Sequence, residues 1–300
     1  MYNEEVKNAY LSTLEPVKLN KAKNLFEKSS MLEDFKNKDL AKFTKKDILY
    51  LFTSLKTISI ESLRQKNNQI RSYKEWYKNN FQDKEITQFE ITKTDYQECL
   101  DKNRYFTEEM TDKITAQQKN PFTKFIIRAI FEGIRGENLS ELVFAKITDI
   151  NKDEHKMKVY NCESFDEDGK PLIKEREIIV SDKLILFAEE CCNSCEIQRR
   201  DGLTAGYLED NGYIIKDKKN MKKEQKSTYK QIRAKAATIR KRLTESVSIN
   251  DLQINPTFLF YSGIIDELKK GINESRLLFI EKQYNISRKE IEKIEDNFIR

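Results

Sequence analysis

The stretch FEGIRGENLSELVFAKITDINKDEHKMKV, residues 131–159, contains the signals that decide the fold. It begins where an apolar helical pattern stops at Gly133, and glycine is the residue type that most often ends a helix. Arg135 and the tripeptide SEL at 140–142 follow, and residues 156–159 have the character of a strand. This order predicts a helix, a short second helix and then the first strand of a hairpin.

The residues on either side of this stretch extend the same pattern. Asn120–Pro121 is a capping residue followed by a proline at the first helical position, and apolar residues then recur at helical spacing. Strands at 156–160 and 174–180 are joined through the turn sequence DEDGKP. Further helices are expected after residue 180, and the last one opens with the capping box SRKE at 287–290.

The amino-terminal part of the chain has a different composition. It contains no glycine before residue 133, which favours long uninterrupted helices. Apolar residues follow helical spacing at 44–55 and 59–80. We therefore expect a helical domain at 1–95, a linker at 96–105 within the polar stretch 81–105, and a mostly helical second domain with a small sheet at 106–300.

The overall composition is that of a globular protein with a strongly charged surface. Of the 300 residues, 38% are apolar and 35% are charged, but the net charge is only +5, which is a weak argument for a polyanionic partner. No apolar run approaches the roughly 18 residues of a membrane span. The polar amino terminus is unlike a secretory signal, and the five cysteines are expected to stay reduced in a cytoplasm. The single histidine, His155, excludes a multi-histidine metal site.

The motifs within residues 131–150 resemble the first motif of the tyrosine recombinase (phage integrase) family. In that family a helix ends in glycine, an apolar residue and arginine, a Ser-Glu-Leu follows, and an aspartate with an apolar residue leads into a hairpin. The corresponding residues here are Gly133-Ile134-Arg135, Ser140-Glu141-Leu142 and Asp149-Ile150. In one departure from the usual spacing, the extra residues GENL separate Arg135 from Ser140.

The helices expected at 44–80 resemble the amino-terminal core-binding domain of the same family. The resemblance implies a mainly α fold with a small β-sheet, organised as two domains. The first is a helical core-binding-like (SAM-like) domain, and the second is an integrase catalytic-type domain that has degenerated.

The degeneration is inferred from the catalytic residues that the resemblance implies. The family's chemistry needs a tyrosine that attacks a DNA phosphate, two arginines that hold it and a lysine on the hairpin. Arg135 matches the first arginine, and Lys170 or Lys174 matches the lysine, but the second arginine and its histidine fall on Asn255 and Leu252. The tyrosines of the last quarter are Tyr229, Tyr261 and Tyr284, and the final helix offers Phe298 instead of a nucleophile. We therefore expect no catalytic residues.

A recombinase fold without its catalytic set is suited to binding alone, and the chain resembles the lysogeny-maintaining repressors of SPbeta-type Bacillus phages (the MrpR/YopR-like family). The phrase FIIRAIFEGIRGENLSEL is close to that family's sequence. The resemblance implies sequence-specific binding to a double-stranded DNA operator, repression of transcription, and a location on the nucleoid in the cytoplasm of a bacterial host. It implies no cofactor, no small-molecule substrate and no membrane contact. A phage-encoded antagonist or co-repressor protein is expected as a further partner.

A basic run at 216–243 is the main reason in the residues themselves to expect DNA binding. It holds twelve lysines and arginines against two acids. Its second half predicts a helix with an inward stripe of Ile232, Ala236, Ile239 and Leu243. The residues expected to contact DNA there are Lys230, Arg233, Lys235, Arg240, Lys241 and Arg242. The alternative is a solvated helix face, the usual role of a charge run.

Other candidate contacts are dispersed along the chain. Arg135 is a candidate phosphate anchor, with an ion pair to Glu137 or Glu141 as the alternative, and Lys170 is a candidate contact on the hairpin. In the first domain the polar face of one helix contributes Arg64, Lys66, Asn68, Arg71 and Lys74, or forms an ordinary solvated face. Cys192 and Cys195 make only half of a zinc motif, so we expect no metal.

Two other functions stay open at this point. One is an active but divergent tyrosine recombinase that performs site-specific strand exchange with Arg135 and a tyrosine at an unrecognised place. The other is an interaction protein without a DNA role. A second arginine beside Arg135 that faces a tyrosine would favour the enzyme, whereas a neutral or acidic cleft would favour the interaction protein.

Overall fold

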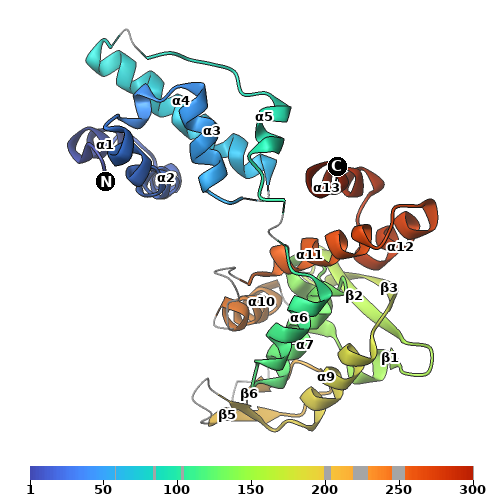
Figure 1. Ribbon diagram of the computed structural model, residues 1–300. Helices are drawn as coiled ribbons and strands as arrows, with labels where there is room; N and C mark the ends of the chain where they lie inside the picture. Colours follow the sequence, from blue (N-terminus) through green and yellow to red (C-terminus); the bar gives the residue numbers. More distant parts are fainter. Residues whose placement is uncertain are drawn as a thin grey trace. The chain divides into compact units, whose positions relative to one another are not determined.

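The computed structural model describes residues 1–57, 59–83, 86–102, 105–198, 204–218, 229–244 and 254–299. The chain divides into two compact units, Met1–Arg104 and Tyr105–Arg300, whose elements are labelled in Figure 1. None of the helices in the described ranges combines the length and the apolar character that crossing a membrane requires.

The first unit is built from helices. They are α1 (Glu4–Leu11), α2 (Pro16–Lys36), α3 (Lys45–Ser54), α4 (Ile60–Phe81) and α5 (Lys93–Glu98), with a short 3-10 turn at Leu40–Lys42. Thr44 opens α3 in a capping box with Asp47, and the Ser59 hydroxyl accepts a hydrogen bond from the backbone N–H of Ser62 at the start of α4. The helices predicted at 44–55 and 59–80 are confirmed.

A buried ion pair fastens α1 to this unit. The Lys7 ammonium lies 2.5 Å from Oε2 of Glu33 on α2, and both side chains are fully buried. The same carboxylate accepts hydrogen bonds from the Ser29 hydroxyl at 2.7 Å and from the backbone N–H of Leu40 at 2.7 Å. Every oxygen of the buried carboxylate therefore has a partner, as burial of a charge requires.

The polar stretch after α4 belongs to the first unit, which differs from the linker expected at 96–105. Ile86, Ile91 and Tyr96 are buried in the same core as α2 and α3, and so are Cys99 and Leu100. These apolar residues recur about every five positions, which matches neither the helical nor the strand period. The stretch is mostly extended chain with one short helix. Its buried residues therefore show no regular spacing from which an element could be predicted.

The second unit combines helices with two small antiparallel sheets. Its helices are α6 (Glu108–Ala116), α7 (Pro121–Phe131), α8 (Ser140–Phe144), α9 (Asp182–Asn193), α10 (Tyr229–Thr244), α11 (Pro256–Lys269), α12 (Glu274–Tyr284) and α13 (Arg288–Phe298), with 3-10 turns at Glu137–Leu139 and Ile147–Asp149. One sheet has the order β1 (Ile150–Asn151), β2 (Lys156–Phe165), β3 (Pro171–Ile179), and the other has β4 (Glu196–Gln198), β5 (Thr204–Glu209), β6 (Asp217–Lys218).

The β2–β3 hairpin confirms the strand pair predicted from the sequence. Lys158 pairs with Glu177 and Tyr160 with Glu175 in an antiparallel register. The β4–β5–β6 sheet was not predicted, because its strands are short and carry no sustained alternation of apolar and polar residues.

Helix α7 forms the centre of the second unit. Asn120 caps it and Pro121 occupies its first turn, as predicted, and Gly133 follows it with a φ of 99°. Helix α11 approaches α7 closely at Gly263, where a Cβ atom would lie 2.0 Å from the carbonyl oxygen of Phe131. Only glycine fits this crossing.

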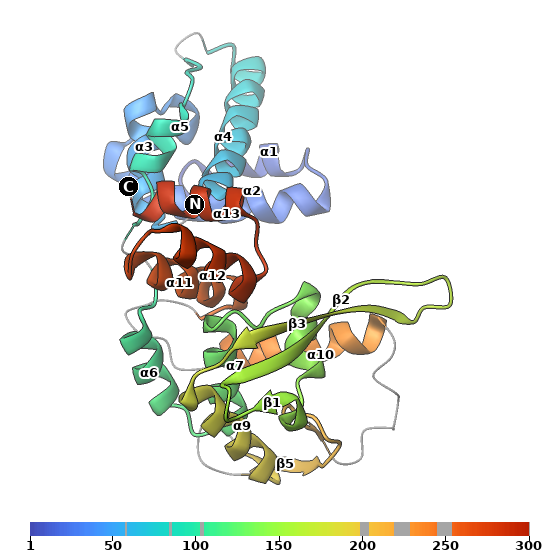
Figure 2. The ribbon, with the colours of Figure 1, turned by 90° about the vertical axis from the view of Figure 1, so that its right-hand side faces the viewer.

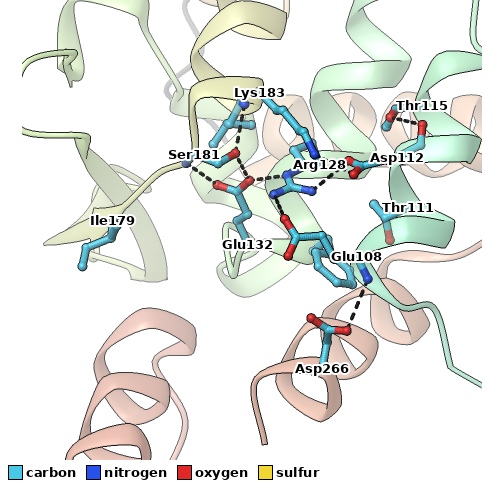
Figure 3. Close-up of polar contacts among 12 residues, drawn as sticks. Glu108, Thr111, Asp112, Thr115, Arg128, Glu132, Ile179, Ser181, Lys183 and Asp266 are labelled. Atoms are coloured by element: carbon cyan, nitrogen blue, oxygen red, sulfur yellow. Dashed lines mark hydrogen bonds and ion pairs between the residues drawn. The ribbon is translucent and has the colours of Figure 1, made fainter. Parts of the chain in front are cut away.

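A buried arginine on α7 connects two other segments (Figure 3). Arg128 is 3% exposed, and its guanidinium lies 3.0 Å from Glu108 and 3.2 Å from Asp112, both on α6. It also contacts Glu132, whose carboxylate accepts a hydrogen bond of 3.0 Å from the backbone N–H of Ser181 at the start of α9. The network joins α6 and the start of α9 to α7, and we assign it a structural role.

Candidate functional site

The turn after α7 places Arg135 at the edge of a pocket. A Cβ on Gly133 would lie 2.5 Å from the carbonyl oxygen of Gln283, so the glycine lets the end of α12 approach this turn. The Arg135 guanidinium carbon lies 5.0 Å from the centre of the Phe260 ring on α11. The carboxylates of Glu137 and Glu141, the expected alternatives, form no ion pair with this guanidinium in the described structure.

The inserted residues between Arg135 and Ser140 adopt an unusual backbone. Asn138 has a φ of 50° and Leu139 has a φ of 61°, and Gly136, two positions before Asn138, has a φ of 65°. Left-handed backbone is unfavourable for leucine, and the buried Leu139 side chain, which is 2% exposed, offsets that cost by packing in the core. The unusual spacing noted in the sequence thus corresponds to a local left-handed turn beside the pocket.

Glu141 is held by an arginine that the sequence analysis did not select. Arg176 on β3 forms a two-pronged ion pair with the fully buried Glu141, with distances of 2.7 Å and 2.8 Å. Arg176 also donates to the carbonyl oxygens of Gly133 at 2.8 Å, Gln283 at 2.8 Å and Lys282 at 3.1 Å. Its donors are thus directed at the protein. The sequence did contain a signal for this role, because side chains alternate along β3 and Arg176 therefore lies on the same face as the buried Ile178.

The pocket that contains these two arginines is predominantly acidic. It encloses about 370 Å³, and it is lined by Arg135, Gly136, Glu137, Glu141, Asn161, Glu163, Arg176, Phe260, Tyr284, Asn285, Ile286 and Glu290. Four carboxylates therefore face two guanidinium groups, one of which is already paired with Glu141. A phosphate here would meet an excess of negative charge, so the pocket is poorly suited to clamping a DNA phosphate.

Tyr284 lines the pocket but does not present a nucleophile. Its hydroxyl donates a 2.9 Å hydrogen bond to the carbonyl oxygen of Phe131, and burial raises its pKa well above the usual value for tyrosine. Phe298, at the end of the last helix, is buried. Two arginines and a tyrosine thus line one pocket, and of the two arginines only Arg176 is paired with a carboxylate among the described residues, whereas Arg135 lies over the Phe260 ring.

Asn255, the residue at the position expected for a second catalytic arginine, has a structural contact instead. Asn255 caps α11, since its side-chain oxygen accepts a 2.9 Å hydrogen bond from the backbone N–H of Phe258. Leu252 lies outside the described residues, as does the side chain of Tyr229.

Helix α10 presents a smaller basic face than the sequence predicted. Its stripe of Ile232, Ala236, Ile239 and Leu243 is buried, as expected. Lys235, however, is turned toward the protein: its ammonium lies 2.6 Å from the carbonyl oxygen of Ile215 and 3.1 Å from Asp217, and its side chain is only 10% exposed. Arg242 is half-buried, with its guanidinium 5.5 Å from the centre of the Phe122 ring. The expectation that Lys235 and Arg242 face outward is corrected.

The remaining basic residues of α10 are exposed. Arg233, Arg240 and Lys241 lie on the solvent side of the helix, between the small residues Ala234, Ala237 and Thr238. The side chain of Lys230 and residues 219–228 of the basic run lie outside the described part of the chain. We call Arg233, Arg240 and Lys241 the α10 basic face.

The hairpin residue Lys170 is exposed, with its ammonium 3.9 Å from Asp168 in the same turn. Cross-strand acids also lie close to the other hairpin lysines: Lys156 lies 3.4 Å from Glu177, and Lys158 lies 3.4 Å from Glu175. The hairpin therefore carries little net positive charge toward a duplex.

In the first unit, the candidate residues of α4 separate into two groups. Arg64, Asn68 and Arg71 are exposed along one side of the helix. Lys66 is half-buried and donates to the Ser62 hydroxyl at 2.9 Å. Lys74 is 2% exposed and donates to the carbonyl oxygen of Phe43 at 2.5 Å, so it is not available to DNA, and burial lowers its pKa to about 8.

A search of the described residues for groups of three or more histidine, cysteine or acidic side chains arranged to hold a metal ion found none. Cys192 is half-buried and Cys195 is exposed.

Comparison with known proteins gives matches over both units. The family model described as MrpR, C-terminal catalytic domain, matches residues 105–300, and the model described as MrpR, N-terminal core-binding domain, matches residues 1–79. A curated relative, the SPbeta prophage-derived uncharacterized protein YopR of Bacillus subtilis (strain 168), is 26% identical over 234 residues, covering 74% of this chain and 69% of that protein. These matches confirm the predicted resemblance and the two-domain, mainly α organisation.

Two solved structures are also similar to this chain. The XerA recombinase is 14% identical with a TM-score of 0.42, covering 99% of this chain and 94% of the other. The Tn1549 transposon integrase (residues 82–397), in complex with circular intermediate DNA, is 13% identical with a TM-score of 0.41 and the same coverages.

Proposed function

The chain belongs to the MrpR family, and from that premise we propose that it is a sequence-specific DNA-binding protein that represses transcription and maintains phage lysogeny without cutting DNA. Its partner is a double-stranded DNA operator, on the nucleoid in the cytoplasm of a bacterial host. A phage-encoded antagonist or co-repressor protein would act on the repressed state.

The α10 basic face is the observation that carries the DNA-binding part of this proposal. Arg233, Arg240 and Lys241 extend from one side of a helix whose intervening residues are small, so a duplex can approach the helix closely. The exposed Arg64, Asn68 and Arg71 of α4 form a comparable polar surface in the first unit. Phosphates and base edges are recognised by these side-chain types.

The pocket beside Arg135 supports the loss of strand cleavage. Cleavage needs a nucleophile that can deprotonate and a positive site for the phosphate. Tyr284 is buried with its hydroxyl bonded to a backbone carbonyl, Arg176 is paired with Glu141, and Asn255 caps a helix. The excess of carboxylates would also favour an interaction protein without a DNA role, but it concerns this pocket and leaves the α10 basic face unaffected.

The salt dependence of binding tests the proposal. Duplexes are first recovered by pull-down of genomic fragments with the full chain and identified by sequencing. Because each phosphate contact releases about one counterion, Arg240→Ala is expected to flatten the slope of log K against log salt by about 0.9. Lys235→Ala is the matched control on the same helix and is expected to leave the slope unchanged, since that ammonium is held by Ile215 and Asp217.

Two outcomes of these binding measurements would contradict the proposal. If the combined change of Arg233, Arg240 and Lys241 to alanine altered neither the affinity nor the slope, the α10 basic face would be a solvated surface. If the unaltered chain retained no fragment above background, DNA binding itself would be refuted.

A further inference from the structure

Helix α2 carries two large apolar side chains that point into solvent. Met31 is 82% exposed and Phe35 is 86% exposed, one helical turn apart on the same side of the helix. Single exposed apolar residues are common on protein surfaces, but two adjacent ones at this exposure form a patch.

Charge of both signs borders this patch, with the exposed Glu27 and Asp34 on one flank of α2 and lysines on the other. Lys28 lies one turn before Met31 on the same side of α2, and Lys66 of α4 lies near it. Burial, and then the positive charge of Lys28, lower the pKa of Lys66. Neither lysine has a carboxylate partner among the described residues. We call Met31, Phe35, Lys28 and Lys66 the α2 face.

The tip of the β2–β3 hairpin has the complementary character. Figure 2 shows the hairpin extending away from the rest of the second unit. Its turn contains Asp166, Glu167 and Asp168 against the single Lys170, and all four are exposed. Next to the turn, Leu172 is 52% exposed and Ile173 is 48% exposed. Backbone hydrogen bonds of 2.9 Å and 3.0 Å across the turn hold these residues in place.

We propose that the hairpin tip of one copy docks on the α2 face of a second copy of this chain. Leu172 or Ile173, whose side chains point to opposite faces of β3, would cover Met31 and Phe35, while the acidic turn would neutralise Lys28 and Lys66. A DNA backbone would satisfy the lysines but leave Met31 and Phe35 in water, so the combined chemistry favours an acidic segment with apolar side chains over phosphate.

This contact joins two different surfaces, so in a pair one copy keeps an unused α2 face and the other an unused hairpin tip. Such a head-to-tail contact produces rings or open chains of copies, and the number of copies in an assembly increases with protein concentration. A contact made by a hairpin tip is smaller than the roughly 1,200 Å² of stable complexes, so the association is expected to be weak and reversible.

Sedimentation velocity of the full chain without DNA tests the inference over a wide concentration range. The sedimentation coefficient should rise with concentration for the unaltered chain. Met31→Glu with Phe35→Glu, or Leu172→Glu with Ile173→Glu, should each weaken the association about tenfold or more. Tyr50→Glu on α3, at a side chain that is 63% exposed outside the α2 face, is the matched control and should change nothing.

A mixture of the two double variants identifies the partner. One variant keeps its hairpin tip and the other keeps its α2 face, so the mixture should form pairs although neither variant associates alone. A second arm reverses the charges: Lys28→Glu and Lys66→Glu should weaken association, and Asp166→Lys with Asp168→Lys in the same chain should restore it.

Three results would overturn the inference. The first is a sedimentation coefficient of the unaltered chain that does not change with concentration. The second is a mixture that stays unassociated, as docking within one chain would give. The third is a Met31→Glu, Phe35→Glu variant that loses DNA affinity while its self-association is unchanged, which would make the α2 face a DNA contact. Because the sedimentation experiment contains no DNA, self-association can fail there while the proposed function holds.

Discussion

Replacing Arg176 by methionine tests whether this arginine holds the second unit together rather than serving a reaction. The change keeps much of the side-chain volume but removes two hydrogen bonds to Glu141 and three to backbone carbonyls. Glu141 is fully buried and would retain only the 2.8 Å hydrogen bond from the backbone N–H of Arg135. Breaking a buried pair by removing one partner costs about 3–5 kcal/mol, because the other charge stays uncompensated.

Urea denaturation of the full chain measures this loss. For a slope of about 2–3 kcal/mol per molar urea, the midpoint of the second unit is expected to fall by about 1–2 M. Far-UV circular dichroism reports both units, whereas the fluorescence of the single tryptophan, Trp76, reports only the first. The loss should therefore be visible by circular dichroism.

A matched variant separates the buried charge from the lost contacts. Glu141→Gln in the Arg176→Met background removes the uncompensated carboxylate, so it should recover part of the stability. Arg176→Met with a midpoint within about 0.3 M of the unaltered chain, corresponding to less than about 1 kcal/mol at these slopes, would refute the structural role.

Three further outcomes follow from the structure. Because burial lowers the pKa of Lys74 to about 8, below the roughly 10.4 of a free lysine, the unfolded chain binds more protons between these values, and the free energy of unfolding should rise by up to about 1.4 kcal/mol per pH unit above pH 8. Lys74→Met should abolish that rise in the free energy of unfolding, which is measured by following Trp76 fluorescence during denaturation. An identical rise in the variant would contradict the assignment. Gly263→Ala should destabilise the second unit by about 1–3 kcal/mol, since its Cβ would lie 2.0 Å from the Phe131 oxygen. Gly212→Ala meets no atom within 4 Å but carries a backbone cost at its φ of 76°, so a loss at Gly263 that exceeds the loss at Gly212 reports the packing clash. A nicked suicide duplex carrying the bound sequence should form no covalent adduct with the chain, and an adduct that disappears on changing one tyrosine to phenylalanine would overturn the inactive assignment.

Helix boundaries were predictable from the sequence because they depend on neighbouring residues. Asn120, Ser181 and Ser287 each cap the helix that follows them through hydrogen bonds spanning two or three positions. The inward stripe of α10 was predictable for the same reason, since it follows from helical spacing alone. Both features need no knowledge of distant parts of the chain.

The side chains at the edge of each buried stripe were not predictable. Lys235 and Lys74 stand next to apolar stripe positions, and only the folded chain supplies the carbonyl oxygens of Ile215 and Phe43 that bind them. The contact made by Arg176 was unpredictable for the same reason, because its partner Glu141 lies 35 positions earlier. A sequence pattern assigns a side chain to a face of its element, but it does not identify an acceptor contributed by a remote segment.

The ion pair between Lys7 and Glu33 makes the beginning of the chain part of the folded unit rather than a removable tail. Loss of residues 1–7 would leave the buried Glu33 with only the Ser29 hydroxyl and the Leu40 N–H. An unpaired buried carboxylate costs about 3–5 kcal/mol. Aminopeptidase digestion of the native protein should therefore stop before position 7, and fusions at the amino terminus should be tolerated only where α1 stays docked.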